Sequence, residues 1–402
     1  MPSIGRRDLL RLGAASSVIP LASVAVGQET PAAGEVQRYV RLGRTDMRIS
    51  DVSFGSSRLR RGGEHLVHHA LDRGINYFDT ADGYSAGASE HTIGRALEGR
   101  RDKVCIASKF QAGRDETRVS LMRALDTSLR RLRTDYIDVY FNHAVNDIAR
   151  MANPEWHEFT AMAKQQGKIR FTGMSGHGTR LIECLDYVFD EDLVDVVLVA
   201  YNFGQDPSFL SNITRSFRLP EQPDLPRVLA KAKSRDVGVV TMKTLMGARL
   251  NDMRPYETGD ATFSQAAFRW VLSDANVDAL VISMTEEGQI DEYLGGSGGL
   301  PVSSEDLALL ERYAVANGIT YCRHACSLCE GACPYGVPIP DVLRTRMYAT
   351  DYGDVRFARE EYSKLEENAS ACLSCTGEPC AGACPHGIDL PTFAPATHRM
   401  LA

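Results

Sequence analysis

The chain has 402 residues, 44% of them hydrophobic, and a formal net charge of −7 at pH 7. This length predicts about two to three domains, and the apolar content is sufficient for a large core. The acidic balance argues against nucleic acid as the main partner, and no apolar run is long enough for a mature transmembrane helix.

The chain begins with a basic segment that contains Arg6-Arg7-Asp8-Leu9-Leu10, followed by a weakly apolar stretch over residues 12–26 and small residues over 22–34. This pattern is typical of a secretory signal, and the paired arginines resemble a twin-arginine signal. A disordered basic tail is the alternative. Twin-arginine machinery exports folded proteins with their cofactors inserted. We therefore expect residues 1–34 to be a signal and linker, the export machinery to be a partner, and the mature protein to be periplasmic.

From about residue 50 to about residue 284, short runs rich in Val, Ile and Phe alternate with amphipathic segments. The expected strands cover residues 51–55, 75–79, 104–109, 137–143, 169–175, 194–201, 237–243 and 279–284. Examples of the expected helices cover residues 64–73, 90–100, 117–131 and 154–166. Eight such units predict an α/β fold, a (β/α)8 TIM barrel over residues 35–315. Residues 39–42 and 47–50 flank a turn, which predicts a hairpin across the barrel floor.

An open doubly wound sheet is the alternative architecture. Such a sheet usually carries a glycine-rich phosphate loop after its first strand. Gly55-Ser56-Ser57-Arg58 follows the first expected strand and does not match that loop.

Three successive expected strands end in Asp79, Lys109 and His143, and Tyr84 follows on the next loop. Active groups of a parallel barrel gather at this end of the strands. A lysine beside a tyrosine lowers the phenol pKa and makes the phenol a general acid near neutral pH. Taken singly, Asp79 could cap a helix, Lys109 could extend to solvent, His143 could be a core histidine, and Tyr84 could serve packing.

Eight of the ten cysteines form two runs, each ending in Cys-Pro, within an expected domain over residues 316–402. The first run is Cys322, Cys326, Cys329 and Cys333; the second is Cys372, Cys375, Cys380 and Cys384. Four thiolates per run match two [4Fe-4S] clusters. Disulfides and structural zinc remain the alternatives. Cys105 and Cys184 are expected to be ordinary core residues.

Residues 36 to about 295 resemble the aldo/keto reductase family. The resemblance is carried by Asp79-Thr80-Ala81-x-x-Tyr84, Ser89-Glu90-x-x-x-Gly94, Ser108-Lys109, Tyr136-Ile137-Asp138-x-x-x-x-His143 and Gly167-Lys168-Ile169-Arg170-x-x-Gly173-x-Ser175. It implies that Tyr84 donates the proton, Lys109 tunes Tyr84, Asp79 holds Lys109, and His143 orients the substrate.

The cysteine-rich tail resembles a two-cluster ferredoxin, in which the fourth cysteine of each run binds the other cluster. The resemblance implies one set of ligands from Cys322, Cys326, Cys329 and Cys384, and a second set from Cys372, Cys375, Cys380 and Cys333. We therefore expect a small, ferredoxin-like, cysteine-rich α domain after the barrel.

The reductase resemblance also implies NADP(H) as a cofactor. Candidate contacts are Gly55, Ser56, Ser175, Leu245, Gln289 and Glu292. Several family positions differ: Gly176 replaces an asparagine, Leu198 a glutamine, and Met242 the tyrosine that stacks on the nicotinamide. Met284 and Gln289 stand where cations grip the 2′-phosphate, and loss of charge weakens phosphate recognition.

The leading hypothesis is an exported oxidoreductase that interconverts a carbonyl and an alcohol on a small polar substrate. Two [4Fe-4S] clusters and an electron-transfer protein partner accompany that activity. The alternative is an iron–sulfur electron-transfer protein whose barrel is a non-catalytic scaffold or binds a partner. Substrate selection is expected in the loops over residues 58–63 and 214–226, and in the surface of the tail.

Overall fold

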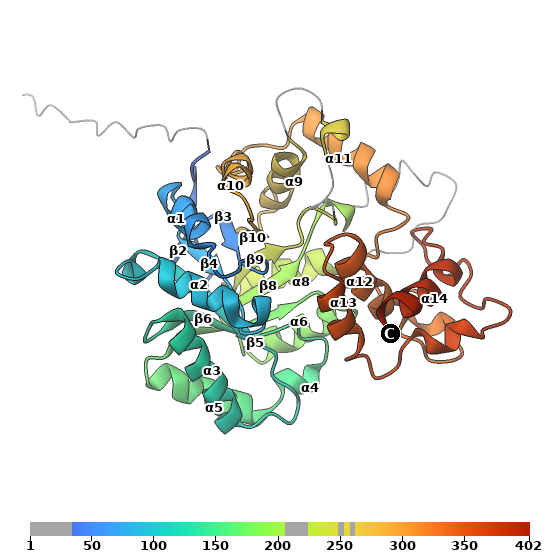
Figure 1. Ribbon diagram of the computed structural model, residues 1–402, viewed down its shortest axis with the longest axis horizontal. Coiled ribbons are helices and arrows are strands. Elements are labelled where there is room, and N and C mark those ends of the chain that lie inside the picture. Colours follow the sequence, from blue (N-terminus) through green and yellow to red (C-terminus); the bar gives the residue numbers. More distant parts are fainter. Residues whose placement is uncertain (1–33, 206–223, 248–252, 258–261) are drawn as a thin grey trace, which may run out of the picture. The chain divides into compact units, whose positions relative to one another are not determined.

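The computed structural model describes residues 34–205, 224–247, 253–257 and 262–402 (Figure 1). The expected signal and most of the 214–226 insertion lie outside these residues. The barrel and the cysteine-rich tail belong to one compact unit. None of the described helices is both long and apolar enough to cross a membrane.

The predicted barrel is confirmed. Its parallel strands close into a ring in chain order, because β10 pairs with both β9 and β3. The strands are β3 (Val52–Gly55), β4 (Tyr77–Asp79), β5 (Cys105–Phe110), β6 (Ile137–Asn142), β7 (Ile169–Gly176), β8 (Val196–Ala200), β9 (Gly238–Met242) and β10 (Ala279–Ser283). Their burial on both faces explains the nearly continuous apolar runs of the sequence.

Helices surround this ring, as Figure 1 shows. They are α1 (Glu64–Asp72), α2 (Ala88–Ala96), α3 (Arg118–Leu132), α4 (Ile148–Met151), α5 (Pro154–Gln165), α6 (Leu181–Asp190), α8 (Leu225–Ser234), α9 (Phe263–Leu272) and α10 (Glu287–Leu294). Thr117 caps α3 with a capping box, and Asn153 caps α5 ahead of a proline, so these helices begin close to where the sequence predicts.

Six of the eight predicted strands are shorter than expected, and β8 is shorter by three residues. β4 begins at Tyr77 because the backbone N–H of Ile75 bonds to the carbonyl of Ala70 and so closes the end of α1. At the start of β3, the backbone N–H of Asp51 bonds to the carbonyl of Arg38 in the hairpin, and its carboxylate accepts from the N–H of Val52 and the hydroxyl of Ser297.

The expected hairpin covers the barrel floor. β1 (Tyr39–Arg41) and β2 (Arg48–Ser50) pair antiparallel, and Leu42 and Ile49 pack against inward-facing side chains of the barrel. Gly43 adopts φ +48°, and a Cβ there would lie 2.1 Å from the backbone nitrogen of Gly238. A glycine is therefore required where the hairpin meets β9.

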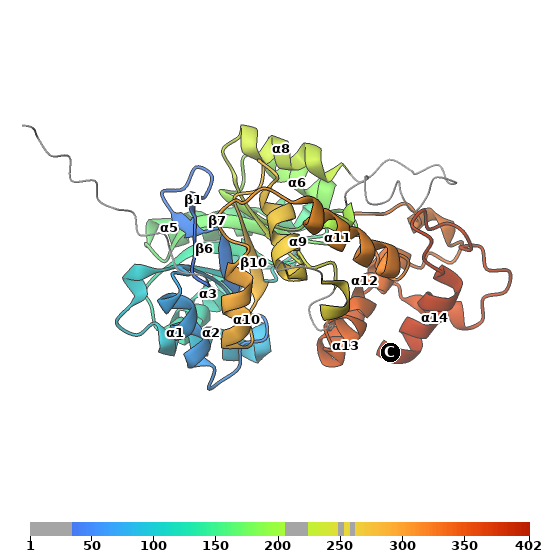
Figure 2. The ribbon, with the colours of Figure 1, turned by 90° about the horizontal axis from the view of Figure 1, so that it is seen from above.

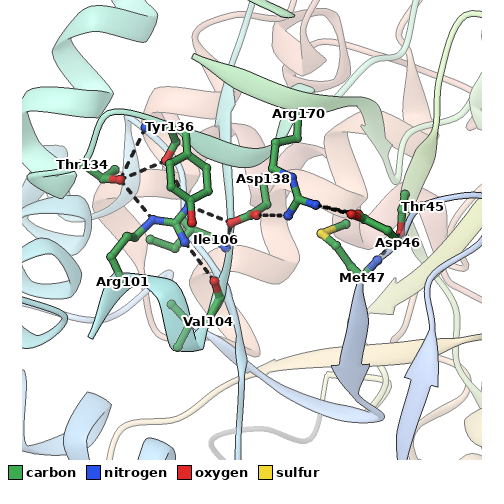
Figure 3. Close-up of polar contacts among 10 residues, drawn as sticks. All are labelled: Thr45, Asp46, Met47, Arg101, Val104, Ile106, Thr134, Tyr136, Asp138 and Arg170. Carbon is green, nitrogen blue, oxygen red and sulfur yellow. Dashed lines mark hydrogen bonds and ion pairs between the residues drawn. The ribbon is translucent and has the colours of Figure 1, made fainter. Parts of the chain in front are cut away.

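Figure 3 shows the polar network that ties this floor together. Asp138 is buried, and its carboxylate accepts from Arg101 at 2.7 Å, Arg170 at 2.7 Å and the N–H of Ile106 at 2.8 Å. Arg170 also binds Asp46 of the hairpin turn. Two of the sequence motifs therefore meet at the end of the barrel opposite the rim, where polar networks serve stability.

The described residues of the tail form helices joined by loops, and the two cysteine runs lie mostly in those loops. Its helices are α11 (Ser304–Asn317), α12 (Ile339–Thr350), α13 (Val355–Tyr362) and α14 (Leu390–Leu401). Helix α11 runs across the expected domain boundary at residue 315. In Figures 1 and 2, α12 and α13 lie between the barrel and α14. This arrangement brings part of the tail to the rim of the barrel.

Candidate active site

A cavity of about 830 Å³ opens at the carboxyl ends of the barrel strands. Its walls come from loops that follow the strands and from the tail helices α12 and α13. The four residues that the sequence predicts at the rim, Asp79, Tyr84, Lys109 and His143, all line it. The barrel thus brings together side chains from three strands and one loop, at the end where barrels hold reacting groups.

Lys109 is the centre of this group. It is fully buried, and its Nζ donates to Asp79 Oδ1 at 2.6 Å, to the Thr80 carbonyl at 2.6 Å and to Tyr84 Oη at 3.4 Å. Burial lowers the pKa of Lys109, but Asp79 and Tyr84 outweigh burial, so the net shift is upward. Burial raises the pKa of Asp79, and Lys109 opposes that shift. Lys109 is therefore an ammonium at neutral pH and does not extend to solvent.

Tyr84 begins a strained turn. Ser85 and Ala86, directly after it, have φ of 50° and 55°, in the left-handed region that non-glycine residues rarely occupy. Such strain persists where surrounding structure holds it, often at functional sites. Here Arg131 donates to the carbonyl of Asp82 at 3.0 Å. The turn presents the Tyr84 hydroxyl to Lys109.

His143 follows β6 and meets Tyr84 edge-on, with ring centroids 5.6 Å apart. Burial lowers its pKa well below the usual value, and the charge of Lys109 adds to this effect. The imidazole is therefore neutral and can donate one N–H. Arg150 on α4 holds the loop, because its guanidinium binds the carbonyl of His143 at 2.7 Å and the side chain of Asn142 at 2.8 Å.

The motif Ser89-Glu90 supports the site without entering it. The Ser89 hydroxyl donates to Ser56 at 2.6 Å and contacts Thr80 at 2.7 Å. Glu90 is fully buried, and its carboxylate accepts from the Ser108 hydroxyl at 2.7 Å and from Arg131 at 3.1 Å. These contacts fix the segments on either side of Lys109.

Comparisons with known proteins agree with this geometry. Residues 61–254 match the sequence profile of the aldo/keto reductase family. The barrel is therefore similar to that of an aldo/keto reductase. The chain is an oxidoreductase of this type.

Individual relatives are distant. The chain is 24% identical over 305 residues to "Uncharacterized oxidoreductase YqkF" of Bacillus subtilis. That alignment covers 69% of this chain and 96% of the relative. It is 25% identical over 293 residues to L-galactose dehydrogenase of Arabidopsis thaliana, covering 62% of this chain and 85% of that protein. The solved structure of aldo-keto reductase AKR11C1 from Bacillus halodurans superposes with a TM-score of 0.55 at 22% identity, over 68% of this chain and 95% of that one. That superposition supports the fold.

The nucleotide contacts expected for an aldo/keto reductase fall into two groups. Gly55, Ser56, Ser175 and Leu245 line the cavity. Gln289 and Glu292 lie on α10, outside the set that lines it. Gln289 is held locally: its Oε1 accepts from the N–H of Thr285, just before α10, at 2.9 Å, and its Nε2 donates to the Tyr293 hydroxyl on α10 at 2.9 Å.

One observation bears directly on a dinucleotide. Arg58 follows β3 and lines the cavity, and its Nη2 is buried without a hydrogen-bond partner among the described residues. A buried guanidinium nitrogen of this kind suits a phosphate oxygen. Ser175 lies across the cavity, and its hydroxyl oxygen accepts from the N–H of Ala144 at 3.0 Å, which leaves its own proton available to donate. The donor set fits a nicotinamide dinucleotide, although uncharged Met284 and Gln289 stand near strand β10.

The eight tail cysteines divide into two groups in space. Burial raises the pKa of Cys329 to about 12, with added effects from Cys322, Cys384 and Cys326. Burial also raises the pKa of Cys372, with added effects from Cys333, Cys380 and Cys375. Each group takes three thiols from one run and the last thiol of the other run. This is the partition that cross-ligation requires.

Among the described residues, no three His, Cys, Asp or Glu side chains lie close enough to share one metal ion. The thiolates of a cubane bind four different iron atoms, so they stand farther apart than the ligands of a single zinc ion. The backbone N–H groups of His386 and Ile388 also point towards the sulfur of Cys384. Hydrogen bonds of this kind tune iron–sulfur clusters, and the donor set fits two clusters.

Sequence reasoning missed the tail residues that face the cavity. Tyr348, Tyr352 and Phe357 complete its wall, opposite the rim residues of the barrel. His177 and Lys243, directly after β7 and β9, also line it. The positions of His177 and Lys243 at strand ends carried a usable signal, whereas nothing local marked Tyr348.

Proposed function

We propose that this protein interconverts a carbonyl and an alcohol on a small polar substrate, with Tyr84 as the proton donor. One observation carries the proposal: a buried ammonium, that of Lys109, lies 2.6 Å from a carboxylate and 3.4 Å from a phenol that faces the cavity. The ammonium stabilises the phenolate that remains after Tyr84 gives up its proton.

In the reducing direction, the substrate oxygen accepts the Tyr84 proton while the carbonyl carbon accepts a hydride. A nicotinamide, when bound, supplies that hydride. Ser175 and Arg58 would hold such a cofactor, on opposite sides of the cavity. Neutral His143 donates an N–H to the same oxygen and so orients it. Asp79 keeps Lys109 charged through the reaction. In the oxidising direction the Tyr84 phenolate takes the proton back.

The tail supports an additional redox role. Cys322, Cys326, Cys329 and Cys384 would hold one [4Fe-4S] cluster, and Cys333, Cys372, Cys375 and Cys380 the other. Clusters of this type transfer one electron at a time. The first group lies on the side of the cavity: His324, between Cys322 and Cys326, bonds through Nδ1 to the carbonyl of His177 at 3.0 Å. An electron-transfer protein is the partner that such clusters serve.

The N-terminal segment supports export. Arg6 and Arg7, with the apolar stretch that follows, are the basis for proposing transport by the twin-arginine machinery and a periplasmic location. The name of L-galactose dehydrogenase indicates a sugar as the substrate of that relative. This name favours a hydroxylated substrate for the present protein.

The experiment uses full-length protein purified anaerobically, with a panel of aldehydes, ketones and sugars. NADPH and dithionite-reduced methyl viologen serve as alternative reductants. We expect reduction of at least one class of substrate. Tyr84→Phe should lower kcat by about a hundredfold or more while the fold is retained. Tyr187→Phe, on α6 and outside the cavity, is the matched control.

Two results would contradict the proposal. Full activity in Tyr84→Phe would exclude the phenol as the proton donor. Clusters that cycle between redox states with no turnover on any substrate would favour an electron-transfer protein with a scaffold barrel.

A further inference from the structure

A second tyrosine faces the cavity from the tail. Tyr348 on α12 is 9% exposed, and its hydroxyl lies 3.4 Å from Lys243 Nζ and 3.3 Å from His177 Nε2. All three residues line the same cavity as Tyr84. Lys243 and His177 follow barrel strands, whereas Tyr348 lies in the tail, 105 positions after Lys243.

The cavity therefore contains two similar groups. The first trio is Tyr84, Lys109 and His143; the second trio is Tyr348, Lys243 and His177. In each trio the lysine nitrogen is 3.4 Å from the phenol oxygen and 4.6 Å from the centroid of the tyrosine ring. In each, the histidine meets the tyrosine edge-on, at 5.6 Å and 79° in the first and 6.3 Å and 80° in the second.

The second trio is held by contacts between barrel and tail. Asn202 binds the carbonyl of Lys243 at 3.0 Å and the hydroxyl of Tyr321 at 3.1 Å, so it joins the loop after β9 to the tail. Arg344, one turn before Tyr348 on α12, binds the Thr179 hydroxyl at 2.6 Å. These buried contacts give the second trio a fixed place relative to the barrel strands.

The charges of the second trio indicate what it can bind. Burial raises the pKa of Tyr348 well above its usual value, and Glu361 adds to the effect. Burial lowers the pKa of His177 well below its usual value, helped by Lys243. Tyr348 is thus a neutral phenol and His177 a neutral imidazole, and both can donate or accept a hydrogen bond beside the Lys243 nitrogen. This set suits an oxygen atom of a bound ligand.

We infer that the second trio is a subsite for a second oxygen atom of the substrate, and that the substrate is a polyhydroxylated aldehyde, ketone or alcohol. This inference rests on the proposed function of the first trio, which would hold the reacting oxygen. The two trios lie near one another: Tyr84 contributes to the raised pKa of Tyr348, and His177 to the lowered pKa of His143. A substrate that reaches both carries oxygen atoms on separate carbons. The tail thereby selects the substrate as well as carrying cysteines.

The test compares aldoses of increasing length, from glyceraldehyde to ribose, with alkanals of the same length. The ratio of kcat/KM for the aldose to that for the alkanal is the readout. Tyr348→Phe removes one hydroxyl and should lower this ratio by about tenfold or more, mainly through KM. Tyr187→Phe should leave the ratio unchanged. Tyr84→Phe should lower both terms together.

A binding measurement separates this inference from the proposed function. Saturation-transfer NMR compares ribitol with pentan-1-ol on the same variants. Wild type should bind ribitol preferentially, and Tyr348→Phe should lose that preference. If no substrate turns over but the preference exists and depends on Tyr348, the proposed function fails and the subsite stands. If the protein reduces the aldoses and Tyr348→Phe leaves both the kinetic ratio and the NMR preference intact, the subsite is refuted.

Discussion

The buried ion pair Asp79–Lys109 leads to a prediction about the free energy of unfolding and how it depends on pH. The two side chains are 4% and 0% exposed and lie 2.6 Å apart. Removing one partner of such a pair leaves a buried charge without compensation and costs about 3–5 kcal/mol. We expect Asp79→Asn and Lys109→Met each to lose stability in this range. The double variant, with neither charge, should lose less than the sum of the two.

The two single variants should respond to pH in opposite directions. In Asp79→Asn, burial dominates at Lys109, so its folded pKa falls below its unfolded value. The unfolded state then binds more protons, and stability is lost as the pH falls. In Lys109→Met, burial raises the folded pKa of Asp79 above its unfolded value. The folded state then binds more protons, and stability is lost as the pH rises. Each slope is at most about 1.4 kcal/mol per pH unit.

Urea unfolding between about pH 5 and about pH 9 measures these slopes. The fluorescence of Trp156 on α5 and Trp270 on α9 reports on the barrel. Glu98→Gln breaks an exposed pair with Arg133 and serves as the control, since such pairs contribute about 0–1 kcal/mol. Slopes of the same sign in the two buried-pair variants, or losses below about 1 kcal/mol, would refute a buried ionised pair.

Three further predictions concern other parts of the molecule. His143 is neutral in the folded protein because its pKa is lowered, so the unfolded state binds more protons and stability falls as the pH drops below about 6.5. His143→Gln should remove up to about 1.4 kcal/mol per pH unit of that slope, measured by urea unfolding. An unchanged slope would contradict this prediction. Asp138→Asn should destabilise the barrel floor by about 1–3 kcal/mol, a moderate loss because its partner Arg170 is partly exposed. It should leave kcat and KM unchanged because the active site is at the other end of the barrel. Altered kinetics in folded protein would contradict this prediction. For the cysteines, Cys322→Ser should lower bound iron by about half. Adding Cys384→Ser should lower iron no further, whereas adding Cys333→Ser should remove the rest; iron analysis with electron paramagnetic resonance decides between crossed and uncrossed ligation.

Much of the barrel follows from local sequence. Each strand is a short apolar run between helices with an amphipathic period, and these two signals are carried by neighbouring residues. All parallel strands of a barrel end at one rim. Placing Asp79, Lys109 and His143 at strand ends was therefore enough to predict that their side chains lie close together. The structure places them with Tyr84 around one cavity.

Local signals could also mislead. The run beginning at Ile75 reads as strand from its first residue, yet Ile75 bonds back to Ala70 and ends a helix. The assignment of Gln289 and Glu292 to the nucleotide stays a prediction from resemblance; both lie on α10, beyond the residues that line the cavity. These outcomes depend on hydrogen bonds and helix placement, which the residue types alone do not encode.

By itself, the sequence determined the barrel, the rim residues and the two runs of cysteines, because each depends on the spacing of residues within one segment. Only the tertiary structure decided that the tail closes the cavity and that Tyr348 meets Lys243 and His177 there. Those contacts join residues 105 and 171 positions apart, and they form because α12 packs on the barrel rim. No periodicity or spacing in the chain specifies which distant surfaces will pack together, so the second trio emerges from packing alone.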